Sequence, residues 1–183
     1  FQIVRAKWSS PIRRLGESTV SFLPVAWVLL MLTWFGKEHL FPWGHEVMAG
    51  REVWMNPTFV YLRFAVLMGG LFALLTLFVR WSLRGDVGLC RERAQNSRFW
   101  SQPWAEVLTR GWKGTEAEVH ELQPKMSRMA PVIIFAYAII YSLFAFEMVM
   151  AMDPLWFSNM FGGFIFVGNV YLAWGGLAML TII

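Results

Sequence analysis

The sequence predicts an all-α, polytopic membrane protein whose spanning helices form a four-helix bundle. Hydrophobic residues make up 57% of the chain and charged residues 15%, whereas soluble domains have roughly 45–50% and 25%. The nineteen residues between Glu17 and Lys37 and the thirty from Pro154 onward carry no charge. About 20 apolar helical residues cross a hydrocarbon layer of about 30 Å, so these stretches predict membrane spans and argue against a soluble enzyme. One cysteine, Cys90, excludes an intrachain disulfide scaffold.

The spans are bounded by the polar segments between them. We expect spanning helices over residues 18–36, 57–81, 129–152 and 156–183. The connecting parts are an N-terminal segment (1–17), a loop (37–56), a long basic and aromatic loop (82–128) and a turn (153–155). A backbone surrounded by lipid has to satisfy its own hydrogen bonds, so the spans are expected to be helices. The sequence lacks the ten-residue segments of alternating polarity that are typical of an outer-membrane barrel.

Lysine and arginine are distributed unequally among the connecting parts. Four precede the first span and nine lie between Arg80 and Arg128, whereas the loop 37–56 has two and the turn 153–155 has none. Basic residues are enriched on the cytoplasmic side of a membrane. We therefore expect the N-terminus and the loop 82–128 in the cytoplasm, and the loop 37–56 and the turn on the periplasmic side.

The long cytoplasmic loop combines tryptophan with basic residues. Its aromatic and basic members alternate and are Arg98, Trp100, Trp104, Arg110, Trp112 and Lys113. This pattern is typical of a segment that lies along lipid headgroups. Such a cluster can also bind single-stranded nucleic acid, but beside four membrane spans we expect lipid as the partner and no nucleic acid. Thr115 and Glu118 have capping-box spacing, so we expect a short helix near 115–122 that Pro124 ends.

The histidines predict no haem in this chain. A b-type haem needs axial ligands, usually two histidines on facing helices, whereas His39, His45 and His120 all lie outside the expected spans. The sequence has no Cys-x-x-Cys-His, no cysteine cluster and no glycine-rich phosphate loop. We therefore expect no cofactor or metal bound directly by this chain and no catalytic residue in it.

Two charges inside the expected spans are the candidate functional residues. Glu147 follows eighteen uncharged residues and precedes Asp153 by six positions, so it lies roughly 9 Å inward from the turn. Arg63 lies at a similar depth in the second span, which starts from the same side. A charge in hydrocarbon usually faces a partner, a cavity or a proton path. The pattern predicts an Arg63–Glu147 pair and leaves three roles open: a static pair that fixes helix packing, a Glu147 that relays protons with Asp153 nearby, and snorkelling to interfacial water.

Other polar and small residues predict helix packing. The stripe of the third span below Glu147 is apolar, so we do not expect a proton relay along that helix alone. Asn169 in the last span predicts an interhelical hydrogen bond, with a place in a relay as the alternative. Ala65, Gly69 and Ala73 recur every four residues and predict a close approach of a neighbouring helix.

Two stretches of the chain carry a family resemblance. Residues 146–158 read FEMVMAMDPLWFS, an acid followed by an Asp-Pro-x-Trp-Phe-Ser entrance to the next helix. Residues 34–63 place a His-Leu-Phe-Pro-Trp stretch and an Asn-Pro pair ahead of Phe-Val-Tyr-Leu-Arg. In order and spacing these stretches resemble the ActF family, membrane subunits of bacterial alternative complex III in the NrfD-like group of polysulfide-reductase anchors. Two positions depart from the family pattern, since Leu155 replaces a histidine and Glu147 stands where aspartate is common.

The resemblance implies a subunit of a quinol oxidoreductase in the bacterial cytoplasmic (inner) membrane. The complex of that family oxidises quinol and passes electrons to a cytochrome c through haem c and iron–sulfur clusters. Those groups are held by partner subunits, namely a multihaem cytochrome and an iron–sulfur subunit, and the quinol site is assigned to an ActC-like subunit. A subunit like this chain would be a scaffold with a candidate proton path at Glu147 and Asp153, with Arg63 as neighbour.

Two other functions remain open from the sequence. The chain could be the quinone-binding membrane anchor of another NrfD-like reductase, which requires a pocket with polar groups near a membrane interface. It could also belong to a transporter or channel, in which Glu147 and Arg63 line a substrate path. The chain starts at Phe1 and ends inside an apolar run, so we expect it to be part of a longer subunit.

Overall fold

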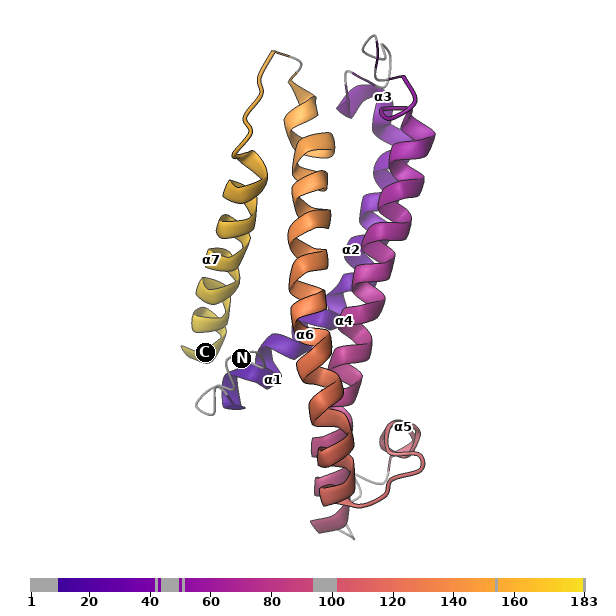
Figure 1. The fold of residues 1–183 in the computed structure, drawn as a ribbon, viewed down its shortest axis with the longest axis vertical. Helices are drawn as coiled ribbons and strands as arrows, with labels where there is room; N and C mark the ends of the chain where they lie inside the picture. Colours follow the sequence, from indigo (N-terminus) through magenta and orange to yellow (C-terminus); the bar gives the residue numbers. More distant parts are fainter. Residues whose placement is uncertain are drawn as a thin grey trace.

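The computed structural model describes residues 10–41, 43, 50, 52–93, 102–153 and 155–182, and all the regular elements in these residues are helices. Four helical segments are long and apolar enough to cross a membrane, namely Ile12–Leu40, Pro57–Arg93, Thr115–Met152 and Phe161–Ile182 (Figure 1). The expected all-α, multi-pass membrane fold is therefore confirmed. Residues 1–9 and 94–101, His45 and Pro154, on which parts of the sequence predictions rest, lie outside the described residues.

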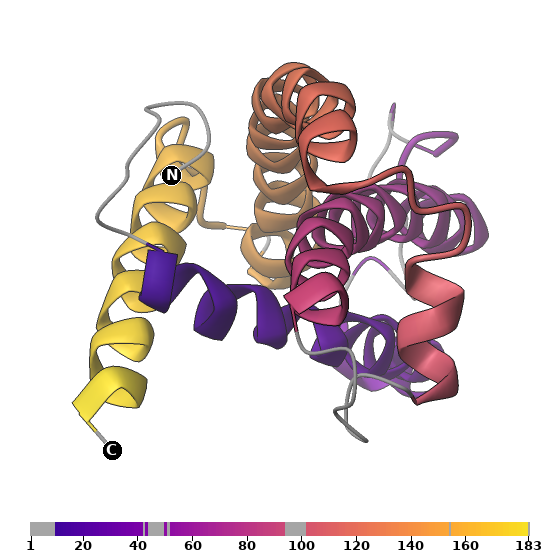
Figure 2. The ribbon, with the colours of Figure 1, turned by 90° about the horizontal axis from the view of Figure 1, so that it is seen from below.

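The first span is a chain of short helices. It consists of α1 (Ser10–Ser18), η1 (Thr19–Phe22), α2 (Leu23–Leu32), η2 (Thr33–Gly36) and α3 (Lys37–Leu40). The hydroxyl groups of Thr19 and Thr33 donate to carbonyls three residues back, at 2.7 and 2.6 Å, and such bonds compete with the regular helical ladder. These helices begin before the predicted start of the span at residue 18 and end after its predicted end at residue 36. Helix α1 runs across the bundle between α7 and α4 (Figure 2).

The second span continues further than the sequence predicts. Helix α4 (Pro57–Arg93) passes the expected end at residue 81 by twelve residues. The reason is tertiary packing, which holds marginal helix ends together. Arg84 forms an ion pair with Glu118 of α6 at 2.7 Å, and the Trp112 indole donates to Glu92 at 2.6 Å while it packs directly on Gly88. The first part of the expected loop 82–128 is therefore helical.

The short helix that was expected near 115–122 is continuous with the third span. Helix α6 (Thr115–Phe144) runs without interruption through Pro124 and Pro131, so the prediction that Pro124 ends a helix is wrong. A proline inside a helix costs about 3 kcal/mol. The buried side chains of Glu118, Leu122 and Met126 offset this cost because they hold this part of α6 in the folded structure.

The end of the third span and the start of the fourth differ from a simple helical hairpin. Helix α6 is followed by the π-helical turn η4 (Ala145–Val149) and the short 3₁₀ turn η5 (Met150–Met152). Helix α7 (Phe161–Ile182) begins five residues later than the predicted start at 156. The Ser158 amide, which lies 3.4 Å from the Met150 sulfur, holds the intervening segment against η5. Trp156 in this segment makes an edge-to-face contact with Phe161 at the start of α7.

Small residues permit two close contacts between helices. On α4, Gly69 faces Trp27 of α2, whose indole donates to the Ala65 carbonyl at 3.1 Å. Ala73, the third member of the predicted small-residue face, is exposed. On α7, an added Cβ at Gly162 would lie 2.9 Å from the Ser142 Cβ of α6. The small side chains therefore set the spacing of α2 on α4 and of α7 on α6.

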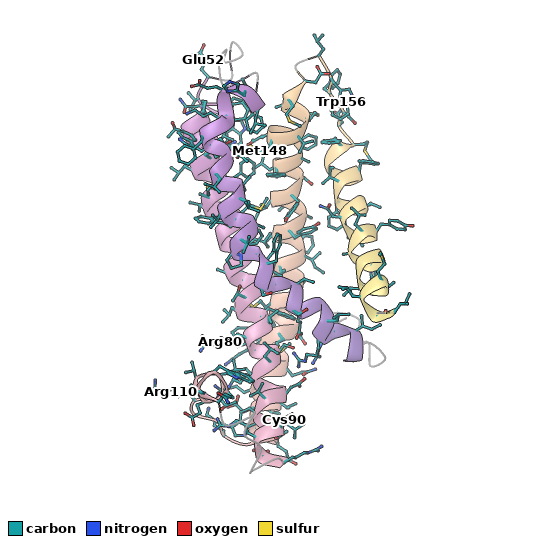
Figure 3. All side chains as sticks on the ribbon, turned by 180° about the vertical axis from the view of Figure 1, so that it is seen from behind. Glu52, Arg80, Cys90, Arg110, Met148 and Trp156 are labelled. Atoms are coloured by element: carbon teal, nitrogen blue, oxygen red, sulfur yellow. The ribbon has the colours of Figure 1, made fainter. Side chains whose placement is uncertain are left out.

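Charge-free segments of similar length define a membrane layer. They cover residues 18–36, 64–79 and 129–146, which at 1.5 Å per residue measure about 24–29 Å, close to the hydrocarbon thickness of about 30 Å. Arg63 and Glu147 bound this layer at one side, called here the Glu147 edge. Arg80 and Arg128 bound it at the other, the Arg80 edge. Figure 3 shows Met148 and Trp156 toward the Glu147 edge, and Arg80, Arg110 and Cys90 toward the Arg80 edge.

Gly162 offers a test of the α6–α7 contact. Gly162→Ala is expected to destabilise the folded chain by about 1–3 kcal/mol, because the new methyl group overlaps Ser142. The neighbouring Gly163 has no atom within 4 Å of an added Cβ, so Gly163→Ala is the matched control and should be neutral or slightly stabilising. The measurement is equilibrium unfolding of the purified chain in bicelles. Equal stability of the two variants would contradict the contact.

Candidate functional site

The candidate site lies at the Glu147 edge, where α4 begins and α6 ends. Asn56 caps α4, since its side-chain oxygen accepts the amide N–H groups of Thr58 at 3.0 Å and Phe59 at 3.4 Å. Asparagine at this position and proline as the first helical residue both favour a helix start. The cap fixes the beginning of α4, and Arg63 is thereby positioned toward Glu147, nearly two turns along the helix.

Glu147 is presented by an irregular turn. It lies in the π-helical segment Ala145–Val149, and 6% of its side chain is exposed. A π turn has one more residue than an α turn and often occurs at functional sites. The extra residue shifts the positions that follow it around the helix axis, so the face of α6 that meets α4 changes at this point. The Glu147 side chain consequently points toward α4, although the residues that precede it on the same face of the third span are apolar.

Both oxygens of the Glu147 carboxylate are held. Arg63 Nη2 donates to Oε2, and the indole Nε1 of Trp54 donates to Oε1 at 2.6 Å. The Arg63 guanidinium also lies over the Trp54 ring, 4.1 Å from its centroid, and donates to the Trp54 carbonyl at 3.4 Å. Arg63, Trp54 and Glu147 therefore form one triad, in which each member contacts the other two.

The triad is an ion pair taken largely out of water. The side chains of Arg63 and Glu147 are 9% and 6% exposed. Burial of such a pair is costly and the mutual attraction offsets it only with good geometry and extra hydrogen bonds, whereas removal of one partner costs about 3–5 kcal/mol. The Trp54 indole supplies such a bond. Arg63 Nε, which is buried, has no hydrogen-bond partner within the described part of the chain.

A cavity of about 550 Å³ adjoins the triad. It is lined by Trp43, Trp54, Glu147, Asp153, Trp156 and Phe157, among others. Asp153 and Phe157 are exposed, so the cavity reaches the surface. The Trp43 side chain is buried, and its indole N–H has no hydrogen-bond partner among the residues that the structure describes. The cavity thus combines aromatic walls with one buried carboxylate.

The structure brings together some of the predicted residues and separates others. Arg63 and Glu147 form the predicted pair. Asp153 does not join it, since its carboxylate accepts the Leu155 amide at 2.9 Å and shapes the turn. Asn169 is half-buried on α7, and no hydrogen bond of its side chain is found within residues 155–182 or the other described ranges.

Neither His39 nor His120 lines the cavity beside the triad. His39 on α3 and His120 on α6 are exposed, and His45 is outside the described residues. No group of three or more histidine, cysteine, aspartate or glutamate side chains in the described ranges is arranged to hold a metal ion. The expectation that this chain binds no haem stays a prediction.

Sequence reasoning did not single out Trp54. Its position two residues before the Asn56–Pro57 helix start is the available signal, because tryptophan is enriched at membrane interfaces where its ring and its N–H meet different surroundings. The π turn leaves no comparable signal. A second polar cluster was also missed, at the Arg80 edge, where Arg14 of α1 bonds to Glu17, Ser82 and Asp86.

Comparison of the chain with protein-family models, with curated proteins and with solved structures finds no match. The chemistry of the site is therefore argued from its geometry. A carboxylate with two hydrogen-bond donors beside a cavity that reaches the surface can exchange a proton with water in that cavity. The same carboxylate, with its arginine, can also lock two helices together.

A comparison of a single and a double variant separates the loss of one charge of the pair from the loss of both. Glu147→Gln is expected to lower the free energy of unfolding by about 3–5 kcal/mol, because it leaves the Arg63 charge buried without its counterion. The combination Arg63→Met with Glu147→Leu removes both charges and should recover most of that loss. The exposed Asp153→Asn should change stability by about 0.5 kcal/mol or less. The measurement is equilibrium unfolding in bicelles, and a double variant no more stable than Glu147→Gln would refute the pairing.

Proposed function

We propose that this chain is an integral membrane subunit of a quinol oxidoreductase of the alternative complex III type, in the bacterial cytoplasmic membrane with its N-terminus in the cytoplasm. The complex transfers electrons from quinol to a cytochrome c. The chain is its non-catalytic scaffold, while haem c, iron–sulfur clusters and quinol belong to partner subunits. Glu147 exchanges protons with the periplasmic side through the adjoining cavity.

One observation carries the proton-exchange role. Glu147 is a buried carboxylate, yet it lines a cavity that reaches the surface at Asp153 and Phe157. An ionisable group in a membrane span that meets a cavity is typical of a proton path. The assembly is supported by the resemblance of residues 34–63 and 146–158 to the ActF family, and the orientation by the excess of basic residues at the Arg80 edge.

The cavity also favours a second candidate, the quinone-binding anchor of another NrfD-like reductase. Ligand pockets are usually apolar and aromatic cavities of about 300–1,000 Å³ with few polar groups. The cavity of about 550 Å³ is lined by three tryptophans and by Glu147. A quinol hydroxyl group could donate to the Glu147 carboxylate. In that case the chain itself contains the site of quinol oxidation.

The native assembly distinguishes these candidates from a transporter. Mild detergent extraction of the full-length subunit with its partners is expected to yield a multihaem cytochrome, an iron–sulfur subunit and an ActC-like subunit. After the subunits are separated, the haem absorbance should be found in the band of the cytochrome subunit. A homo-oligomer that contains no haem would overturn the proposed assembly.

The proton role is tested in the assembled complex. In proteoliposomes, the combination Arg63→Met with Glu147→Leu is expected to reduce the number of protons pumped per electron, beyond those that quinol oxidation itself releases, roughly tenfold or more, because no ionisable group remains at this position. Quinol oxidation with an uncoupler should persist, whereas a quinone-binding anchor would lose it. Glu52→Gln, which neutralises an exposed carboxylate that does not line the cavity, is the control and should retain translocation. Unchanged translocation in the double variant would show that the pair is static.

A further inference from the structure

A short helix, α5 (Pro103–Leu108), is fixed beside the lower part of α4 (Figure 1). Its Ala105 is fully buried, and the hydroxyl of Thr109 at its end donates to the Ala105 carbonyl at 2.7 Å. Arg84 of α4 donates to the Leu108 carbonyl at 3.1 Å. A helix this short is not stable alone, so its position is determined by these contacts.

The two sides of α5 are arranged unlike those of a helix on a water-soluble surface. The buried side carries the small residues Ala105 and Thr109, and Arg91 of α4 bonds to Thr109. The other side carries Trp104 and Val107, which are three positions apart and 46% and 64% exposed. A surface helix in water keeps its large apolar side chains on the buried face. The exposed pair therefore indicates that this side of α5 has a neighbour other than water.

The depth of α5 identifies that neighbour. Trp104 and Val107 line a cavity together with Arg80, the residue that marks the Arg80 edge. Leu108 lines a second cavity, of about 400 Å³, together with Val20 of the first charge-free segment. The headgroup region extends roughly 5–8 Å beyond the hydrocarbon on each side. Helix α5 is therefore placed where the hydrocarbon layer meets the lipid headgroups.

We infer that α5 is an interfacial anchor, whose Trp104 and Val107 insert into the lipid leaflet at the Arg80 edge. Tryptophan is enriched at this depth because its ring is apolar and its N–H is polar. Helices with an apolar exposed side lie in the plane of the interface in this way. The exposed guanidinium of Arg80, beside the pair, can reach headgroup oxygens. The partner is the lipid layer itself and not one lipid species, and the anchor is independent of the proposed function.

The structure gives Trp112 a different place from Trp104, although the sequence predicts headgroup contact for both. The Trp112 ring packs directly on Gly88 and its N–H donates to Glu92 at 2.6 Å. Gly88 is eight residues past Arg80 on α4, which places it about 12 Å beyond the edge. Trp112 thus joins α4 to the start of α6, whereas Trp104 is left at the depth of the headgroups.

The depth of α5 is tested in nanodiscs that hold the native assembly of the full-length subunit. An environment-sensitive fluorescent amino acid replaces Val107 or, as the matched control, Val119, an exposed valine of α6. Val119 is nine residues from Arg128, about 14 Å beyond the edge. We expect brominated phosphatidylcholine to quench the label at 107 strongly and aqueous iodide to quench it weakly, with the reverse at 119. Equal iodide quenching at both positions, or a label at 107 that neither quencher reaches because a protein covers it, would overturn the inference.

A charge at the exposed side of α5 tests whether the lipid contact holds the helix in place. Val107→Asp is expected to lower the hydrogen-exchange protection of the Thr109 amide, which donates to the Ala105 carbonyl at 3.0 Å. The expected loss is roughly threefold or more, since a carboxylate is disfavoured at this depth and α5 is lifted from the leaflet. Val107→Leu and Val119→Asp are the controls and should leave this protection unchanged. Unchanged protection in Val107→Asp would show that α4 alone holds α5, and the anchor role would be wrong.

Discussion

The cost of charge in hydrocarbon is the constraint on which the rest of this structure depends. Helices α4 and α6 carry no charge over residues 64–79 and 129–146, and each charged residue that bounds these segments lies at an edge of the same layer. An unpaired charge near hydrocarbon is expensive, so charges at the edges either find partners or reach water. Arg63 and Glu147 pair with each other, whereas Arg80 and Arg128 are exposed.

The same constraint explains why polar clusters accompany irregular backbone. At the Glu147 edge, a π turn directs a carboxylate toward an arginine on the neighbouring helix. At the Arg80 edge, the first span changes from α1 through a 3₁₀ turn, and Arg14 reaches Ser82 and Asp86 of α4. Between these edges, the Trp27 indole donates to the Ala65 carbonyl, but other contacts are apolar and depend on shape, as at Phe64, whose buried ring meets Phe144 edge-on. Polar interactions thus determine how the helix ends are placed, and packing determines the spacing between them.

The sequence predicts the parts of this fold that follow from long-range composition. The four spans and the depth of Arg63 and Glu147 are predicted from the lengths of the charge-free segments, because the thickness of the hydrocarbon layer that a span has to cross is fixed. The extent of α4 to Arg93 and the passage of α6 through Pro124 could not be predicted, since they depend on contacts such as Arg84 with Glu118 that join distant residues. The role of Trp54 was missed for the same reason: its partner Glu147 is 93 positions away.

If Glu147 exchanges protons as proposed, the triad makes it a structural group as well. Protonation of Glu147 would remove the negative charge that balances Arg63 and would leave that guanidinium with the Trp54 ring and carbonyl as its remaining contacts. Cation–π contacts and a neutral hydrogen bond stabilise a buried cation less than a carboxylate does. Each protonation would therefore weaken the link between α4 and the end of α6, at the point where the π turn already interrupts the helix. In the proposed function, proton uptake at Glu147 would consequently be coupled to the strength of this helix contact through one ion pair.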